Sequence, residues 1–544
     1  MPFSSCSASL TTAAAALLIH PQSGLLHSNE QAALSAALNR EHLNRLARDL
    51  GVQGRLQVKG GWAQRSPKAS ISQSEKEKES GGAESYRDAG GGSGSSATTT
   101  GVVIVGAGLA GLAAATELVA AGRSDFIVVE ASDGVGGRVR TDIYKGFQLD
   151  RGFQILITAY PEAQRILDYD ALQLREFYSG ALVWFDGKFH RIADPVRHFA
   201  DSLLSLFNPI GSVFDKILVG LVRLRVSARA DDDLLSNPDE TSILERLRSV
   251  GFSPPMVDRF FRPFFGGIFF DNDLGTTSRL FDFVFKCLAL GSNTLPARGI
   301  GAIPQQIADR LPQSSILLNS RVTEVIFDED TGRPSGVRLA NGQCLMSKYG
   351  IIMATEGVEA WKLIGRLQGK IIKKPTFSIT KQPRSTVCIY FETDEDRNRQ
   401  LSVMEREPTL LLNGSGKGIV NNMFFPTSVS RTYAPEGKVL VSVSLVGLYE
   451  EKTDEELEAI VREEVSEWLG GVVVASWRHL RTYRIRLAQP DQAPPTNLLQ
   501  DSRLCLGLYI CGDHRYSSTF DGALSSGKQA ARVLLADVNQ QVLN

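Results

Sequence analysis

The chain has 544 residues, of which 43% are apolar and 22% charged, a composition that fits two or three folded domains or one large two-lobed enzyme. With 59 basic against 60 acidic residues its formal net charge is -1, so no overall positive field favours nucleic acid as a partner. The six cysteines are scattered, and neither a disulfide framework nor a metal site is expected from their spacing. No run of roughly 20 apolar residues predicts a transmembrane helix.

The first 98 residues differ from the rest. Residues 1–28 are rich in Ser, Thr, Ala and Leu and contain no Lys, Arg or acidic residue, which is typical of organelle transit peptides. Because the first arginine is Arg40, we predict a transit region over 1–65 that directs the protein to the chloroplast, with the mitochondrion as second choice and an unaddressed tail as the alternative. Residues 66–98 are rich in Ser, Lys, Glu and Gly and predict a disordered linker.

A dinucleotide-binding pattern opens the remaining chain. A β-branched run at 101–105 is followed by the glycine-rich segment 106–111 and by an Ala-rich helix predicted over 112–121. In this GxGxxG pattern the first glycine allows a tight turn, the second lets the backbone approach a pyrophosphate, and the third lets helix and strand pack closely. A second predicted strand, 126–129, ends at Glu130, whose carboxylate is suited to accept ribose hydroxyls. A glycine turn without a ligand would not require Glu130.

The next segment indicates which dinucleotide, NAD or FAD, the protein binds. Residues 131–138 end in Gly136-Gly137-Arg138, and here the sequence resembles the flavin-dependent amine oxidase superfamily, which includes monoamine and polyamine oxidases, protoporphyrinogen oxidases and carotenoid desaturases. The resemblance implies that Gly-Gly-Arg lies along the FAD diphosphate, where a guanidinium can bridge phosphate oxygens. Residues 147–154 look like the short strand and glycine turn that lie near the flavin in this family.

Two later segments strengthen the resemblance, which extends over residues 101–535. Residues 508–513 predict a buried strand ending in Gly-Asp, followed by a helix over 524–535. They are similar to the family's C-terminal flavin segment, which implies that Asp513 binds ribityl or phosphate oxygens and that the helix dipole faces the flavin. In a strand predicted over 317–325, Val322 resembles the position whose backbone holds the adenine. The implied cofactor is FAD.

The residues predicted to bind this cofactor come from all of these segments. They are Gly106, Ala107, Gly108, Leu109, Ala110, Gly111, Glu130, Ala131, Gly136, Gly137, Arg138, Gly152, Phe153, Gln154, Val322, Gly512, Asp513, Phe520, Gly522 and Ala523.

Two apolar regions concern the substrate. Ten phenylalanines lie between Val250 and Cys287, and they predict either an aromatic cavity for a large apolar ligand or the packing of helices. Residues 199–226 form a basic amphipathic pattern that indicates either an ordinary half-buried helix or a peripheral contact with a membrane.

No catalytic residue can be named. Monoamine and polyamine oxidases place a lysine, bonded through water to the flavin, on the strand that resembles residues 385–391, and this stretch has no lysine. Its absence disfavours amine oxidation. His514 follows the Gly-Asp turn and could lie near the flavin, although a structural role is the commoner one for a single histidine. Hydride transfer to a flavin needs mainly proximity, orientation and exclusion of water.

We therefore predict an α/β fold. A Rossmann-like FAD-binding domain of the GxGxxG, glutathione-reductase type (99–180, 292–375 and 495–540) is interleaved with a mixed α+β substrate lobe (181–291 and 376–494). The predicted protein is an FAD-dependent desaturase or oxidase of a hydrophobic carotenoid-, porphyrin- or isoprenoid-like substrate, with quinone or oxygen as electron acceptor. The alternatives are a peroxide-releasing flavin amine oxidase and a non-catalytic flavoprotein that binds a lipid or partner.

Overall fold

The structure is a computed structural model that describes residues 98–205, 207–364, 381–395 and 407–543. The predicted transit region, and all of the predicted linker except Thr98, lie outside these residues. In the part of the chain that is described, no helix is both long and apolar enough to cross a membrane.

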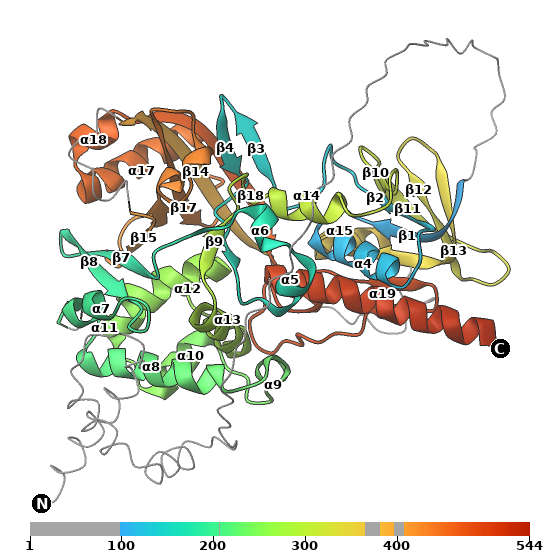
Figure 1. Ribbon diagram of the computed structural model, residues 1–544, viewed down its shortest axis with the longest axis horizontal. Coiled ribbons are helices and arrows are strands. Elements are labelled where there is room, and N and C mark those ends of the chain that lie inside the picture. Colours follow the sequence, from blue (N-terminus) through green and yellow to red (C-terminus); the bar gives the residue numbers. More distant parts are fainter. Residues whose placement is uncertain (1–97, 206, 365–380, 396–406, 544) are drawn as a thin grey trace, which may run out of the picture. The chain divides into compact units, whose positions relative to one another are not determined.

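The first sheet has eight strands and is mostly parallel (Figure 1). β1 (Thr98–Val105) lies in its centre, with parallel partners β2 (Phe126–Val129) and β13 (Cys344–Met353). The remaining strands are β10 (Ile316–Leu317), β11 (Val322–Phe327), β12 (Pro334–Leu339), β19 (Arg503–Cys505) and β20 (Leu508–Ile510). β20 pairs with β13 in parallel, so the C-terminal part of the chain completes the sheet that the first strand begins. The expected α/β fold is present.

Two helices pack together against this sheet. α4 (Leu109–Ala120) follows β1 directly, and α19 (Phe520–Leu543) closes the chain. A side chain at Gly527 of α19 would lie 2.0 Å from the backbone oxygen of Ala110, so only glycine allows the two helices to approach so closely. α19 begins four residues before the helix predicted at Leu524, because the Thr519 hydroxyl accepts a hydrogen bond from the backbone N–H of Gly522 at 3.0 Å.

One predicted strand is interrupted. The sequence predicts a single strand over 317–325, but β10 ends at Leu317 and β11 begins at Val322. Between them Asn319 has a φ of 52°, a left-handed conformation that asparagine tolerates and that a continuous strand cannot contain.

The second sheet has seven strands, in the order β18, β14, β17, β16, β15, β7, β8. Their bounds are Arg478–Gln489, Arg384–Asp394, Lys438–Val446, Val420–Phe424, Leu410–Asn413, Gly180–Phe185 and Lys188–Ala193. All neighbours are antiparallel except β15 and β7. Two smaller sheets are formed by β3 (Thr141–Tyr144) with β4 (Phe147–Asp150), and by β5 (Leu156–Ile157), β9 (Asn293–Leu295) and β6 (Arg175–Glu176).

The helices of the lobe follow β8 in the chain. They are α7 (Phe199–Ser205), α8 (Val213–Ser227), α9 (Asp231–Leu235), α10 (Ile243–Val250), α11 (Pro254–Met256), a π-helical turn (Val257–Phe261), α12 (Arg262–Phe269) and α13 (Ser278–Leu290). The other helices are α5 (Pro161–Ile166), α6 (Tyr169–Leu172), α14 (Ala302–Ala308), α15 (Gly357–Ile364), α16 (Pro426–Val429), α17 (Asp454–Leu469) and α18 (Gly471–Ala475), with 3₁₀ turns at Arg431–Tyr433 and Asp513–Arg515.

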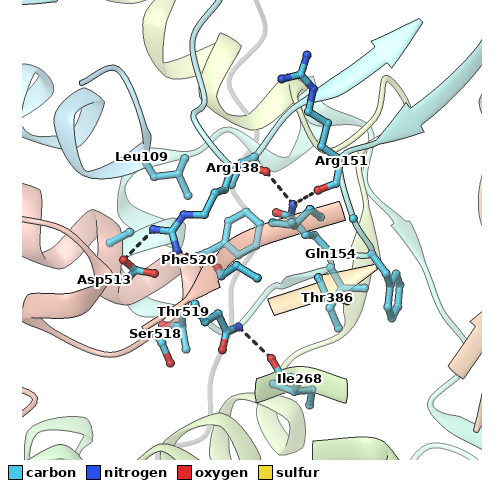
Figure 2. Close-up of a pocket in the computed structure, with 18 of the residues that line it drawn as sticks. Leu109, Arg138, Arg151, Gln154, Ile268, Thr386, Asp513, Ser518, Thr519 and Phe520 are labelled. Atoms are coloured by element: carbon cyan, nitrogen blue, oxygen red, sulfur yellow. Dashed lines mark hydrogen bonds and ion pairs between the residues drawn. The ribbon is translucent and has the colours of Figure 1, made fainter. Parts of the chain in front are cut away.

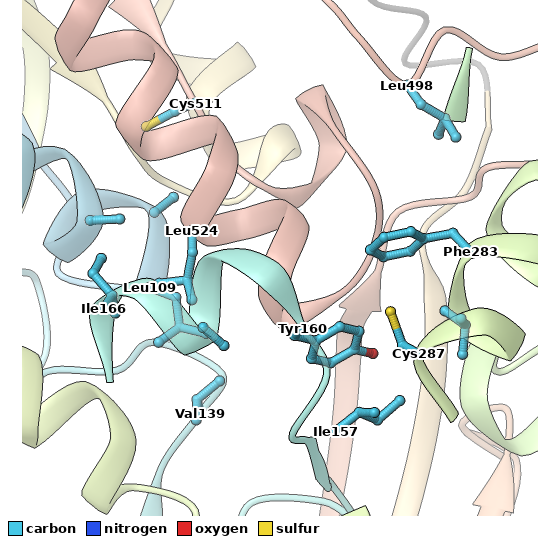
Figure 3. Packing of buried hydrophobic residues seen from close by; sticks show 14 of the residues in the cluster. Leu109, Val139, Ile157, Tyr160, Ile166, Phe283, Cys287, Leu498, Cys511 and Leu524 are labelled. Atoms are coloured by element: carbon cyan, nitrogen blue, oxygen red, sulfur yellow. The ribbon is translucent and has the colours of Figure 1, made fainter. Parts of the chain in front are cut away.

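One apolar cluster connects the two sets of elements. Figure 3 shows Leu109 of α4 and Leu524 of α19 on one side, and Phe283 and Cys287 of α13 on the other, with Tyr160 between them. The rings of Tyr160 and Phe283 are stacked with centroids 6.3 Å apart. Burial of these side chains stabilises the arrangement in which the first sheet and the lobe helices face each other. The exact boundaries of the two domains stay a prediction.

Candidate active site

The parallel strands of the first sheet end at one cavity. Gly106, Glu130, Ala354 and Gly512 each lie next to or just after the end of a strand, and all line a cavity of about 430 Å³. The carboxyl ends of parallel strands are where α/β sheets bind their ligands. The sheet therefore supplies one side of the cavity. The lobe, together with residues 151–178 of the predicted FAD-binding domain, supplies the other, which we call the lobe side.

The glycines of the first motif leave room for a phosphate. Gly106 has a φ of 107°, and a side chain on Gly111 would lie 1.9 Å from the Gly106 carbonyl oxygen, so both positions require glycine. Gly108 precedes the first turn of α4 and lines the cavity, and a Cβ atom built there meets nothing within 4 Å. This open space at a helix N-terminus suits the diphosphate of FAD, which would accept hydrogen bonds from the free N–H groups of α4.

Glu130 is held in place by the backbone. One of its carboxylate oxygens accepts from Ala107 N at 2.8 Å, and the other accepts from the N–H and hydroxyl of Ser132 at 2.8 and 2.7 Å. The carboxylate lines the cavity and is almost fully buried. Because a carboxylate has about four acceptor sites, Glu130 retains capacity for ribose hydroxyls. The structure thus fits the role that the sequence predicts for it.

Arg138 and Asp513 form an ion pair at 2.8 Å across 375 residues of sequence (Figure 2). Arg138 also donates to the carbonyl oxygen of Ala488 at 2.9 Å. Burial alone would raise the pKa of Asp513, but the charge and hydrogen bond of Arg138 hold that pKa below its ordinary value. Both side chains line the cavity. Arg138 was predicted to face the diphosphate, and the structure adds a second role, in which it joins the N-terminal and C-terminal parts of the site.

The wall on the lobe side is largely apolar. Phe153 packs on Phe424 with ring centroids 4.6 Å apart, and Phe424 packs on Phe177 at 5.5 Å. The apolar side chains that line this wall are Phe153, Ile155, Ile157, Tyr160, Phe177, Tyr178, Phe264, Ile268, Phe270, Leu410 and Ile485. Polar groups are few, and they include Gln154, whose amide donates to the Arg138 and Arg151 carbonyl oxygens at 2.9 and 3.2 Å (Figure 2).

The phenylalanine-rich segment is divided between the cavity wall and the packing of helices. Phe264 and Phe270 line the cavity. Most of the others are fully buried in the apolar cluster that contains Phe261 and Phe265. The segment is therefore mainly helix packing, with one edge turned toward the cavity.

Fifteen of the twenty residues predicted to bind the cofactor line the cavity. The other five do not: they are Ala107, Gly111, Ala131, Val322 and Gly522. Gly111 and Gly522 instead allow close packing, since a side chain at Gly522 would lie 2.0 Å from the carbonyl oxygen of Ser517. Binding of FAD by these residues stays a prediction.

Several lining residues were missed from the sequence. Ala354, Thr355 and Glu356 follow β13, and the rule that ligands bind at the ends of parallel strands could have found them. Burial raises the pKa of Glu356, against the opposing charge of Arg138. Tyr178 and Asn422 line the lobe side, and no motif marks either of them.

His514 does not line the cavity. Its side chain is buried, and desolvation lowers its pKa to about 4, so the imidazole is neutral at physiological pH. Among the described residues no group of three or more His, Cys, Asp or Glu side chains could hold a metal ion.

The glycine-rich turn and the cavity at the strand ends are the arrangement by which α/β sheets bind dinucleotides. Residues 109–535 match the family described as flavin containing amine oxidoreductase, and the chain belongs to that family. It is an FAD-dependent oxidoreductase in which the residues described above would hold the flavin.

Solved structures share the fold. An oxidoreductase from Methanosarcina mazei has a TM-score of 0.59 and 18% identity, covering 80% of this chain and 99% of its own. Putrescine oxidase bound to putrescine has a TM-score of 0.57 and 18% identity, covering 81% and 100%. A protein assigned as a protoporphyrinogen oxidase, from Exiguobacterium sp. 255-15, has a TM-score of 0.58 and 17% identity, covering 81% and 100%.

Curated relatives match over short segments. The L-amino acid oxidase Cdc18 of Crotalus durissus cumanensis is 46% identical over 77 residues, which are 14% of this chain and 15% of the relative. Polyamine oxidase 1 of Oryza sativa subsp. japonica is 51% identical over 53 residues, or 9% and 10%. The chain thus matches less than a sixth of the length of these relatives.

Proposed function

We propose that the protein oxidises a hydrophobic substrate of carotenoid-, porphyrin- or isoprenoid-like chemistry, as a desaturase or oxidase. The observation that carries this proposal is the lobe side of the cavity, where aromatic and aliphatic side chains predominate. The three carboxylates that line the cavity, Glu130, Glu356 and Asp513, follow strands of the first sheet, and no lysine is found among the described lining residues. A polyamine carries several ammonium groups, which aromatic rings can receive one at a time, but the lobe side has no carboxylate to pair with the remaining charges. Arg151, the cation of this wall, makes an ammonium group still less favourable, although Asp142 pairs with it at 2.9 Å.

In the proposed reaction, the residues of the chain bind and orient the cofactor and the substrate and keep water away from them. FAD, when bound, would supply a two-electron acceptor for a hydride from the substrate; the accompanying proton would pass to solvent, a double bond would remain in the substrate, and quinone or oxygen would take up the electrons. The apolar wall at Phe153, Phe177 and Phe264 excludes water from the reacting carbon. The ion pair between Arg138 and Asp513 fixes the segments that hold the cofactor.

Asn422 supports a substrate that carries a hydrogen-bond donor. It lies on β16, lines the cavity and is 3% exposed. Its amide nitrogen donates to the side-chain oxygen of Asn421 at 2.7 Å, whereas its own Oδ1 has no hydrogen-bond partner among the described residues. A buried acceptor without a donor costs about 1–3 kcal/mol. Oδ1 is covered in this structure, so a hydroxyl or pyrrole N–H of the substrate would stabilise the complex by donating to it once the Asn422 side chain turns toward the cavity.

Anaerobic reduction of the flavin tests the proposed substrate class. Purified FAD-loaded protein would be mixed with a carotenoid, a porphyrinogen and a polyamine, and the loss of oxidised flavin absorbance followed. We expect bleaching by a carotenoid or a porphyrinogen and none by the polyamine. Bleaching by the amine alone would establish the amine oxidase alternative, and an oxidised flavin under every challenge would favour a non-catalytic flavoprotein. Reoxidation with a quinone and with oxygen then identifies the acceptor.

For the location we propose the chloroplast, with the mitochondrion as second choice. The support is the composition of residues 1–28, which contain no Lys, Arg or acidic residue. A fluorescent protein fused to the C-terminus of the full chain should enter plastids, and the same fusion without residues 1–65 should not. Equal distribution of the two fusions would contradict the proposal.

A further inference from the structure

Exposed apolar side chains concentrate on one stretch of the chain. Seven of the thirteen large apolar side chains that the described residues expose lie between Val196 and Leu224. They are Val196, Leu204, Phe207, Val213, Phe214, Leu221 and Leu224. Phe207 is 87% exposed, Leu204 81% and Phe214 63%. Contiguous apolar patches of this kind mark interaction sites on soluble proteins, whereas single exposed apolar residues are ordinary.

An ion pair and hydrogen bonds connect α8 to residues just before α7, at its end and just after it. Arg223 of α8 pairs with Asp194 at 2.6 Å, and Lys216 of α8 donates to the carbonyl oxygen of Ser205 at 2.6 Å and to Asn208 at 3.1 Å. Asp194 therefore lies next to the C-terminal half of α8, and Ser205 and Asn208 lie next to its N-terminal half. On its other side α8 packs on α13, with Val222 and Val226 buried. We call the seven exposed apolar side chains between Val196 and Leu224, together with the exposed Arg225, the α7–α8 surface.

The charges of this surface favour an anionic partner. The three carboxylates of residues 194–225 are engaged: Asp194 pairs with Arg197 and Arg223, Asp215 is buried, and Asp201 accepts from Tyr178. Arg225, in contrast, is exposed, and no ion pair to it is found among the described residues. The charge of Arg225 acts on the buried Asp282, which already pairs with Arg246. Apolar side chains next to an exposed cation are the combination by which amphipathic helices bind anionic lipid.

The same surface lies directly behind the cavity wall. Tyr178 lines the cavity, its ring stacks on His198 with centroids 4.1 Å apart, and its hydroxyl donates to Asp201 of α7 at 2.5 Å. α7 is thus attached to a residue that faces the site. A protein docked through this surface would hold its cavity close to the compartment in which an apolar substrate is dissolved.

We propose that the α7–α8 surface docks on an anionic lipid bilayer, with Leu204, Phe207 and Phe214 inserted into the interface and Arg225 close to the headgroups. The proposal concerns where the enzyme works and does not depend on which substrate it oxidises. It agrees with the second of the two interpretations that the amphipathic pattern of residues 199–226 allows.

Vesicle flotation tests the docking without any substrate. The full-length FAD-loaded protein would be mixed with vesicles of phosphatidylcholine, alone or with phosphatidylglycerol. We expect binding to both, and tighter binding to the anionic vesicles. Because two exposed phenylalanines are removed from the interface, the double variant Phe207→Ser/Phe214→Ser should bind about tenfold more weakly or worse. Arg225→Glu should reduce only the preference for anionic vesicles.

A matched control uses exposed apolar residues elsewhere. Ile143 and Val472 are 72% and 88% exposed, and Ile143→Ser/Val472→Ser should bind vesicles like the wild type. FAD content and Tm of all variants verify folding, since none of these side chains is buried. The proposal is overturned if the wild type ignores both vesicles, or if the phenylalanine variant binds as well as the control. A wild type that is dimeric in light scattering, ignores vesicles, and becomes monomeric on Phe207→Ser/Phe214→Ser would show an interface between copies instead.

Discussion

The two sides of the cavity are built on different principles. On the side of the first sheet, glycines, backbone N–H groups and the paired charges of Arg138 and Asp513 face the space. On the lobe side, aromatic and aliphatic side chains from scattered elements face it. The phosphates of a cofactor are bound by backbone N–H groups in a particular geometry, and only a short motif of particular residues can adopt that geometry. An apolar substrate requires only a cavity of suitable shape from which water is excluded. The first side therefore tolerates few substitutions, and the second tolerates many.

The largest expected effect is on the cofactor side. Gly108→Asp places a carboxylate in the open space at the N-terminus of α4, where repulsion of the diphosphate should cost several kcal/mol. We expect the Kd for FAD to rise by about a hundredfold or more, measured by titration of the apoprotein. Gly471 is exposed and likewise has open space around it, so Gly471→Asp is the control. Retention of FAD by Gly108→Asp would show that the diphosphate lies elsewhere.

Two neighbouring phenylalanines separate core from cavity on the lobe side. Phe265 is fully buried in the apolar cluster, whereas Phe264 is half-buried and lines the cavity. Phe265→Ala should lower the free energy of unfolding by about 3–5 kcal/mol, measured with urea. Phe264→Ala should cost less stability and should mainly raise KM. If the two variants are equally unstable, the wall at Phe264 is core and not a substrate surface.

The buried carboxyl group of Asp150, at the end of β4, should make the free energy of unfolding depend on pH. Burial raises the pKa of Asp150 to about 6, although Thr141, the Ile300 N–H and Tyr433 donate hydrogen bonds to it. Its stabilising contribution is therefore complete below the ordinary pKa of 3.8 and is lost as pH rises through about 6.

The variant Asp150→Asn removes this titration. Between pH 4 and 7 the wild type should lose about 3 kcal/mol of unfolding free energy relative to the variant. Denaturant unfolding at both pH values measures the difference. Parallel pH profiles of the two proteins would mean that Asp150 does not titrate in this range.

The smallest effect concerns the polar position of the apolar wall. Asn422→Leu removes the buried acceptor at Oδ1 and should raise KM by about tenfold for a substrate that carries a donor. For an analogue without that donor, KM should stay the same or fall. Equal changes for both substrates would assign Asn422 to the structure of β16 and not to recognition.

The sequence was sufficient for the parts that rest on backbone geometry. The order of strand, glycines, helix and Glu130 predicted the first βαβ unit, and the Gly512-Asp513 turn predicted its distant complement. Fifteen of the residues chosen in this way line one cavity. Each reflects a local requirement, such as the close approach of α4 to the turn at Gly106, that only a few residue types can meet.

The remaining parts depend on contacts that no local pattern records. Asn422 and Tyr178 reach the cavity because β16 and β7 occupy particular places in the second sheet. The sequence of either segment alone does not indicate which distant strands it pairs with. The ion pair of Arg138 with Asp513 was hidden for the same reason. The break at Asn319 was missed because a single left-handed residue can interrupt an otherwise strand-like run.

The parallel pairing of β20 with β13 has a consequence for biosynthesis. A ribosome must have made more than 500 residues before Leu508–Ile510 can join the sheet and bring Asp513 to Arg138. Until then the growing polypeptide presents only half of a coenzyme pocket, and the apolar surface shared by α4 and α19 is open to other molecules. Nascent chains of this protein should therefore depend on chaperones, and flavin should be acquired only after residues 508–513 have been synthesised.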